Sequence, residues 1–169
     1  MLSKSDDSLR STRLVFYKED IDGIGKALTT FLKNANARCA LLVDKDGHLV
    51  TKEGESSEYD MDTISALVAG SFAATKQMAK LLGEEEFSIM FHQGKKDNIQ
   101  LSVVGERTIL AVIFDDRTTL GMVRLYAGQV TSKLVDLFNN IAARKSEGEK
   151  ISQDFGQAAK GKLDDIFGN

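Results

Sequence analysis

The stretch NIQLSVVGERTILAVIFD, residues 98–115, decides the fold of this chain. Two runs rich in apolar and β-branched residues are separated by GERT at 105–108, a link of hairpin length. The second run, TILAVIFD, is the most apolar of the strand-like segments. We therefore predict a β-hairpin whose second strand lies at the centre of a sheet.

Further strands flank this hairpin in the sequence. FSIMFHQ at 87–93 precedes it and is joined to it by GKKDN, a second link of hairpin length. Upstream, ALLV at 40–43 is a short apolar run that suits a strand covered on both faces. DKDG at 44–47 supplies a turn into one more strand. Five strands with mostly hairpin connections predict one antiparallel sheet.

Helical patterns alternate with these strands. Residues 17–36 and 118–145 carry apolar residues at three- and four-residue steps, the period of an amphipathic helix. A further helix is predicted over residues 62–82, capped by Asp60 or Asp62. The resulting order, α-β-β-α-β-β-β-α, predicts an α+β fold in which helices pack on a five-stranded antiparallel sheet.

The composition divides the chain into three parts. Residues 1–13 are polar and mixed in charge, which predicts a disordered N-terminal extension. Residues 14–144 hold the predicted elements as one domain. Residues 145–169 are polar and interrupted by glycine, and we predict a flexible C-terminal tail with a short helical motif at an apolar cluster. This cluster consists of Leu163, Ile166 and Phe167. A passive, solubilising tail is the alternative.

The composition also argues against several classes of protein. The net charge is −3 and the sequence pI is about 5.5, which does not favour nucleic-acid binding. No apolar run approaches the roughly 20 residues of a membrane span, and the polar first residues do not resemble a secretory signal. The single cysteine, Cys39, has no partner for an internal disulfide. Together these features predict a cytoplasmic protein without membrane insertion.

The reactive residue types do not predict a catalytic or cofactor site. Cys39 falls in a predicted buried strand, and His48 and His92 lie far apart in the sequence, so neither a nucleophile nor a metal site is expected. GIGKALT at 23–29 lies inside a helical pattern and lacks the glycine spacing of a phosphate loop. Arg117 could act in trans on a nucleotide phosphate, but we favour local pairing with the neighbouring aspartates. We therefore predict no enzyme activity, no cofactor and no metal.

The predicted helix over residues 62–82 has two apolar faces when its residues are placed about 100° apart. The face expected to pack on the sheet contains Ile64, Leu67, Val68, Phe72, Met78, Ala79 and Leu82. The opposite face contains Ala66, Ala69, Gly70, Ala73, Gln77 and Lys80. Gly70 costs roughly 1 kcal/mol relative to alanine inside a helix. We interpret this bare face as a surface that another protein approaches closely; a merely solvated face is the alternative.

Three segments, taken in order, resemble the roadblock/dynein light chain family. They are ALLVDKDGHLV at 40–50, LVAGSFAATKQMAKLLGE at 67–84 and ILAVIFDDRTTLGMVRL at 109–125. The resemblance covers residues 14–144. The ending LDDIF is also similar to the tail of bacterial members that regulate cell polarity and gliding motility.

This resemblance implies a homodimer whose sheets join and whose second helices lie side by side. Two such protomers are expected to bind one small Ras-like GTPase of the MglA type in its GTP state and to accelerate GTP hydrolysis without an arginine finger. Ala69, Ala73 and Gln77 match the family's contact positions. The resemblance further implies that the tail contacts the GTPase and modulates nucleotide exchange, and that the protein is concentrated at a cell pole.

Two other functions remain open from the sequence. One is a roadblock scaffold that binds a GTPase or a motor component without stimulating hydrolysis. The other is a small-molecule sensor, which would need a sizeable apolar pocket between sheet and helices.

Overall fold

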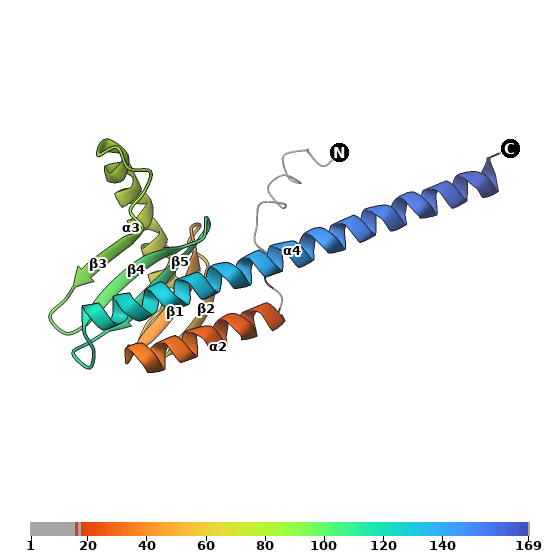
Figure 1. Ribbon diagram of the computed structural model, residues 1–169. Helices are drawn as coiled ribbons and strands as arrows, with labels where there is room; N and C mark the ends of the chain where they lie inside the picture. Colours follow the sequence, from red (N-terminus) through yellow and green to blue (C-terminus); the bar gives the residue numbers. More distant parts are fainter. Residues whose placement is uncertain (1–15, 17, 169) are drawn as a thin grey trace. The chain divides into compact units, whose positions relative to one another are not determined.

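The computed structural model describes residue 16 and residues 18–168 (Figure 1). The elements are α2 (Lys18–Ala35), β1 (Cys39–Asp44), β2 (Leu49–Gly54), α3 (Met61–Leu81), β3 (Ile89–Gln93), β4 (Asn98–Val104), β5 (Thr108–Phe114) and α4 (Leu120–Phe167). This order confirms the predicted α-β-β-α-β-β-β-α sequence of elements. The predicted extension at residues 1–13 lies outside the described residues.

The five strands form one antiparallel sheet in the order β2-β1-β5-β4-β3. Strand β5 lies at its centre, as predicted, and all of its residues are buried. It is the second strand of the hairpin on which the prediction rested, and it pairs with β4 on one side and β1 on the other. Strands β2 and β3 are the two edges.

Helices cover both faces of the sheet within the unit Tyr17–Leu137 (Figure 1). Successive side chains of a strand point to opposite faces, and both sets are buried in β1 and β5. Leu41 and Ile109 belong to the cluster that contains Phe72 of α3. On the other face lie α2 and the beginning of α4, whose buried residues include Leu28 and Val123. Burial on both faces explains why β1 and β5 are continuous apolar runs in the sequence.

Helix α3 begins and ends as its sequence indicates. The Asp60 side chain is the N-cap and accepts hydrogen bonds from the backbone N–H and the hydroxyl of Thr63, at 3.2 and 2.6 Å. Its carboxylate thereby satisfies one of the free N–H groups of the first turn. Gly83 has a φ of +80°, the left-handed conformation that commonly terminates helices.

Helix α4 is longer than predicted. Its sequence pattern predicted an end near Lys145 and a flexible tail, whereas the helix continues to Phe167. The reason is that residues 146–167 contain no proline and are rich in glutamate, lysine, alanine and glutamine, which favour helix more than the interspersed glycines oppose it. The predicted helical motif is thus the end of a continuous helix. None of the helices in the described residues is long and apolar enough to span a membrane.

Candidate docking surface

The outer face of α3 is bare of charge over most of its length. It exposes Leu67, Met78 and Leu81, which are 67%, 53% and 88% exposed. The same face also exposes the small residues Ala66, Gly70, Ala73 and Ala74. A solvated helix usually places charged residues on this face, so the surface is a candidate for docking a partner.

The predicted orientation of α3 was wrong in part. Leu67, Met78 and Leu82 were expected to pack on the sheet, and all three are exposed. Ala69 was expected on the outer face, and only 6% of it is exposed. Both faces of this helix are apolar, so hydrophobic periodicity could not fix its rotation about its own axis. The side that packs on the sheet is centred on Phe72 and includes Ser65 and Val68.

Two of the small residues of α3, Ala66 and Ala69, are needed for packing within the chain. Gly47, in the turn between β1 and β2, has a φ of +97°. A Cβ atom on Gly47 would lie 3.2 Å from the Cα of Ala66 and 3.7 Å from the Cβ of Ala69. Ala66 and Ala69 are therefore small because the turn lies directly against α3.

Gly70 has no such explanation. A Cβ atom on Gly70 would meet nothing within 4 Å. Gly70 is thus not required by packing within the described part of the chain, although it lowers helix stability relative to alanine. We call the exposed residues Gly70, Ala73 and Gln77 the open strip.

Larger apolar residues border the open strip on the side of the edge strand β3. We call Leu67, Met78 and Leu82 the apolar ridge. Thr75, on the same side of α3 as Met78, donates a hydrogen bond of 2.8 Å to the sulfur of Met90 in β3. Ile89, which begins β3, is 50% exposed. The ridge therefore lies beside an edge strand that has no neighbouring strand on its outer side among the residues that the structure describes.

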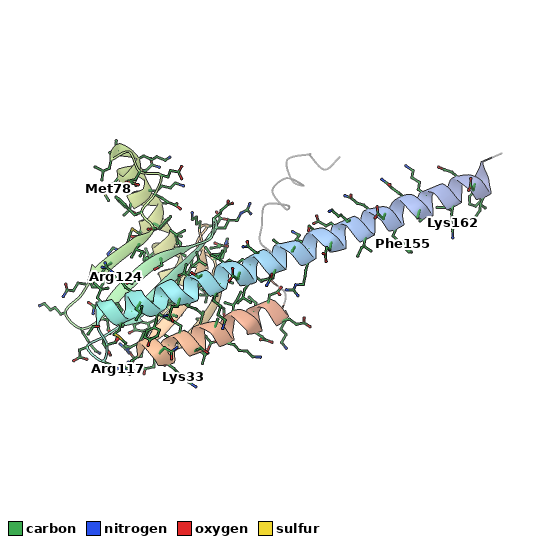
Figure 2. All side chains as sticks on the ribbon, in the orientation of Figure 1. Lys33, Met78, Arg117, Arg124, Phe155 and Lys162 are labelled. Atoms are coloured by element: carbon green, nitrogen blue, oxygen red, sulfur yellow. The ribbon has the colours of Figure 1, made fainter. Side chains whose placement is uncertain are left out.

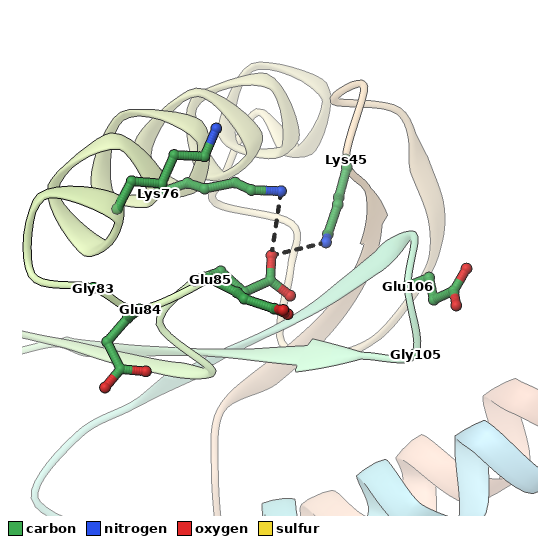
Figure 3. Close-up of a pocket in the computed structure, with 9 residues that line it drawn as sticks. Lys45, Lys76, Gly83, Glu84, Glu85, Gly105 and Glu106 are labelled. Atoms are coloured by element: carbon green, nitrogen blue, oxygen red, sulfur yellow. Dashed lines mark hydrogen bonds and ion pairs between the residues drawn. The ribbon is translucent and has the colours of Figure 1, made fainter.

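Charged residues gather at the C-terminal end of α3, in an open cleft of about 720 Å³ (Figure 3). We call it the lysine cleft. It is lined by Lys45, Lys76, Lys80, Gly83, Glu84, Glu85, Glu86, Gly105 and Glu106. The Glu86 carboxylate lies 3.2 Å from the Lys45 ammonium and 3.7 Å from that of Lys76. Lys80, the one charged residue predicted for the docking surface, is an exposed member of this cleft.

Arg117 is held by carboxylates. Its guanidinium lies 3.2 Å from Glu55 and 3.0 Å from Asp115. Its hydrogen bonds lower the pKa of both carboxyl groups, and those carboxylates in turn raise the pKa of Arg117. The buried Arg38 joins the same cluster, at 3.3 Å from Glu55 and 2.8 Å from Asp97. The predicted local pairing of Arg117 with Asp115 is confirmed, and Glu55 is a partner that the sequence could not reveal.

The potentially reactive residues are engaged in structure. Burial raises the pKa of the Cys39 thiol to about 11, which disfavours the nucleophilic thiolate. Asp44, Asp46 and His48, in the turn between β1 and β2, each offer a ligand atom within 4.8 Å of the others. The Asp44 carboxylate already accepts the backbone N–H groups of Asp46 and His48, at 3.0 and 2.8 Å, and thereby closes the turn before β2.

The last part of α4 carries exposed apolar side chains (Figure 2). The predicted cluster Leu163, Ile166 and Phe167 is 53%, 72% and 80% exposed. Ile151 and Phe155, which the sequence analysis did not single out, are 69% and 77% exposed. Helical spacing places Ile151, Phe155 and Ile166 on one side of the helix, a signal that a helical interpretation of this segment would have detected.

Comparisons with known proteins agree with this architecture. The family model described as the Roadblock/LC7 domain matches residues 24–114. The chain is similar to the solved structure of MglB from Myxococcus xanthus, with 40% sequence identity, a TM-score of 0.71 and coverage of 76% of this chain and 96% of the other. It is also similar to the gliding protein MglB from Thermus thermophilus, with 32% identity, a TM-score of 0.72 and coverage of 75% and 96%. A third structure, MglB with a tetrameric arrangement, shows 30% identity, a TM-score of 0.71 and coverage of 76% and 96%.

Proposed function

Because the chain belongs to the Roadblock/LC7 family, we propose that it is a homodimeric regulator of a small Ras-like GTPase of the MglA type. It binds this GTPase in the GTP state and accelerates GTP hydrolysis, in the service of cell polarity and motility. The observation that carries the proposal is the uncharged outer face of α3. The likeness to MglB supports the choice of partner.

The apolar ridge and the edge of β3 are proposed to bind a second copy of the chain. A ridge of exposed leucine and methionine side chains beside an edge strand is a surface that loses apolar area and gains backbone hydrogen bonds when a second copy packs against it. A two-fold axis would place the two α3 helices side by side and join the two sheets. The tetrameric arrangement of one MglB structure supports self-association in this family.

The open strip and its charged end are proposed to bind the GTPase. Gly70, Ala73 and Gln77 are exposed and lie on the same outer face of α3. The small side chains of this strip allow a partner's backbone to approach the helix closely. Ala66 and Lys80 border the open strip and complete the proposed surface, whereas the buried Ala69 supports it from beneath. Two protomers are proposed to share one GTPase.

The chain is proposed to activate the GTPase without supplying an arginine. Arg117 lies in the loop before α4, and its hydrogen bonds to Asp115 and Glu55 would have to break before it could reach a nucleotide. The protein therefore acts as an activator with no active site of its own. Its contribution is to stabilise the arrangement in which the GTPase's own groups meet the nucleotide and water.

The end of α4 is proposed as a second contact with the GTPase that modulates nucleotide exchange. Leu163, Ile166 and Phe167 are exposed apolar side chains that would be covered by such a contact. A cytoplasmic location, concentrated at a cell pole, is part of the same proposal.

The deciding experiment is a single-turnover GTP hydrolysis assay of the cognate GTPase with and without this protein. Acceleration, with no hydrolysis by the protein alone, is the expected result. Binding without acceleration would instead support the alternative function, a roadblock scaffold. Absence of binding to the GTP state would contradict both.

A further inference from the structure

The lysine cleft holds one carboxylate, that of Glu86, between two lysines. Lys45 comes from the turn after β1, Lys76 from α3, and the Glu86 carboxylate between them comes from the loop after α3 (Figure 3). The Lys45 ammonium also lies 5.2 Å from the centre of the Phe72 ring, a cation–π contact that helps to fix its position. Two ammonium groups from separate elements thus converge on one acidic side chain.

The cleft has room, and one further lysine, for a second carboxylate besides that of Glu86. Lys80 is exposed and has no ion pair among the residues that the structure describes. Gly83 and Gly105 line the cleft without side chains, and the open volume is about 720 Å³. The carboxylates of Glu84 and Glu106 point away from the lysine ammonium groups, whereas Glu85 lies on the same side of the cleft as Glu86 (Figure 3). Lys80 is therefore accessible to an incoming acidic side chain, whereas Lys45 and Lys76 become available only when Glu86 is displaced.

The cleft also adjoins the surface proposed to bind the GTPase. With about 100° between successive helical residues, Lys76 and Lys80 lie next to Ala73 and Gln77 on the circumference of α3. They lie on the side of α3 away from the apolar ridge. A partner seated on the open strip would therefore reach the lysine cleft without meeting the surface proposed for the second copy.

We infer that the lysine cleft is part of the GTPase-binding surface and takes up a carboxylate side chain of the GTPase, which replaces Glu86 between Lys45 and Lys76. This inference rests on the proposed function. In the free protein Glu86 forms ion pairs with Lys45 and Lys76 and therefore competes with the carboxylate of the GTPase for these lysines. The exchange substitutes one carboxylate for another, so the lysine ion pairs lost within the chain are regained with the partner.

The test measures binding of the protein to its cognate GTPase loaded with a non-hydrolysable GTP analogue, at low and at high salt. Glu86→Gln keeps the size of the side chain and removes its charge, so it should tighten binding about two- to fivefold, the range expected from a partly exposed ion pair. The double variant Lys76→Gln, Lys80→Gln should weaken binding about fivefold or more and reduce its salt dependence. Lys33→Gln, on the exposed side of α2, is the control and should leave affinity and salt dependence unchanged.

The outcomes separate this inference from the proposed function. If the parent binds and all variants keep its affinity, salt dependence and solution mass, the cleft is not in the interface and the inference is overturned while the proposed function stands. If Glu86→Gln weakens binding as the lysine variant does, Glu86 supports the interface and does not compete, which also overturns the inference. If the parent does not bind the GTPase at all, the proposed function fails and this inference fails with it.

Discussion

Gly47 lies so close to Ala66 that there is little room for a side chain between them: a Cβ atom on Gly47 would lie 3.2 Å from the Cα of Ala66. This contact holds the turn between β1 and β2 against α3. It also divides the small residues of α3 into those that the chain itself requires and those that face outward.

Gly47→Ala should destabilise the fold by about 1–2 kcal/mol, because a side chain is strained at its positive φ and would press on Ala66. Gly70→Ala is the matched control. Its site is open, so alanine should stabilise α3 by roughly 0.5–1 kcal/mol. Urea unfolding of both variants checks the pair. Equal effects of the same sign would contradict the division of the strip.

Ala73→Arg should abolish activation of the GTPase while leaving the fold intact, because the side chain is exposed and a long cation would hold a partner away from α3. Ala69→Arg should instead unfold the protein, since Ala69 is buried beside the turn. Thermal unfolding and a GTP hydrolysis assay distinguish the two. A stable Ala73→Arg variant that activates as well as the parent would remove the open strip from the interface.

Leu67→Glu, in the apolar ridge, should convert the dimer to a monomer because it would place a charge in an apolar contact. Leu125→Glu is the control, since Leu125 is 54% exposed on α4, away from the ridge. The mass of the Leu125→Glu variant in solution, measured by light scattering, should equal that of the parent. A dimeric Leu67→Glu variant would place the self-contact elsewhere.

The free energy of unfolding should decrease in acid, because the carboxylates that pair with Arg117 become protonated. The pKa values of Glu55 and Asp115 are lowered in the folded state, chiefly by hydrogen bonds from Arg117, below ordinary values of 4.5 and 3.8. The unfolded chain therefore binds more protons near these values, and stability rises with pH there. The contribution is present above about pH 5 and is lost as the pH falls through the folded pKa values.

Arg117→Met should flatten this dependence, which unfolding measurements between about pH 3 and pH 6 would detect. Lys33→Met, which removes an exposed cation from α2, is the control and should keep the slope of the parent. A slope that Arg117→Met leaves unchanged would assign the acid sensitivity to other carboxyl groups.

Phe155→Ala with Ile166→Ala should reduce the effect on nucleotide exchange by the GTPase without changing the melting temperature, because both side chains are exposed. Gln153→Ala with Gln157→Ala, on the opposite side of the helix, is the control. Exchange of a fluorescent nucleotide measures both. If the two pairs behave alike, the end of α4 is a passive extension.

The sheet could be predicted from sequence because burial on both faces makes β1 and β5 apolar throughout and the links between strands are short. The rotation of α3 could not, because Leu67 and Phe72 are both strongly apolar and only tertiary packing decides which of them faces the sheet. The lysine cleft could not be predicted either. Lys45 and Glu86 are distant in sequence and meet only because a turn and a loop are brought to the same end of α3.

The division of the small residues of α3 also has an evolutionary consequence. Ala66 and Ala69 are constrained by the chain's own stability, whereas Gly70 and Ala73 would be constrained only by a partner. Positions constrained by stability and positions constrained by a partner thus alternate within about two turns of α3. Lineages that changed their partner would be free to vary one set of these positions and would have to keep the other.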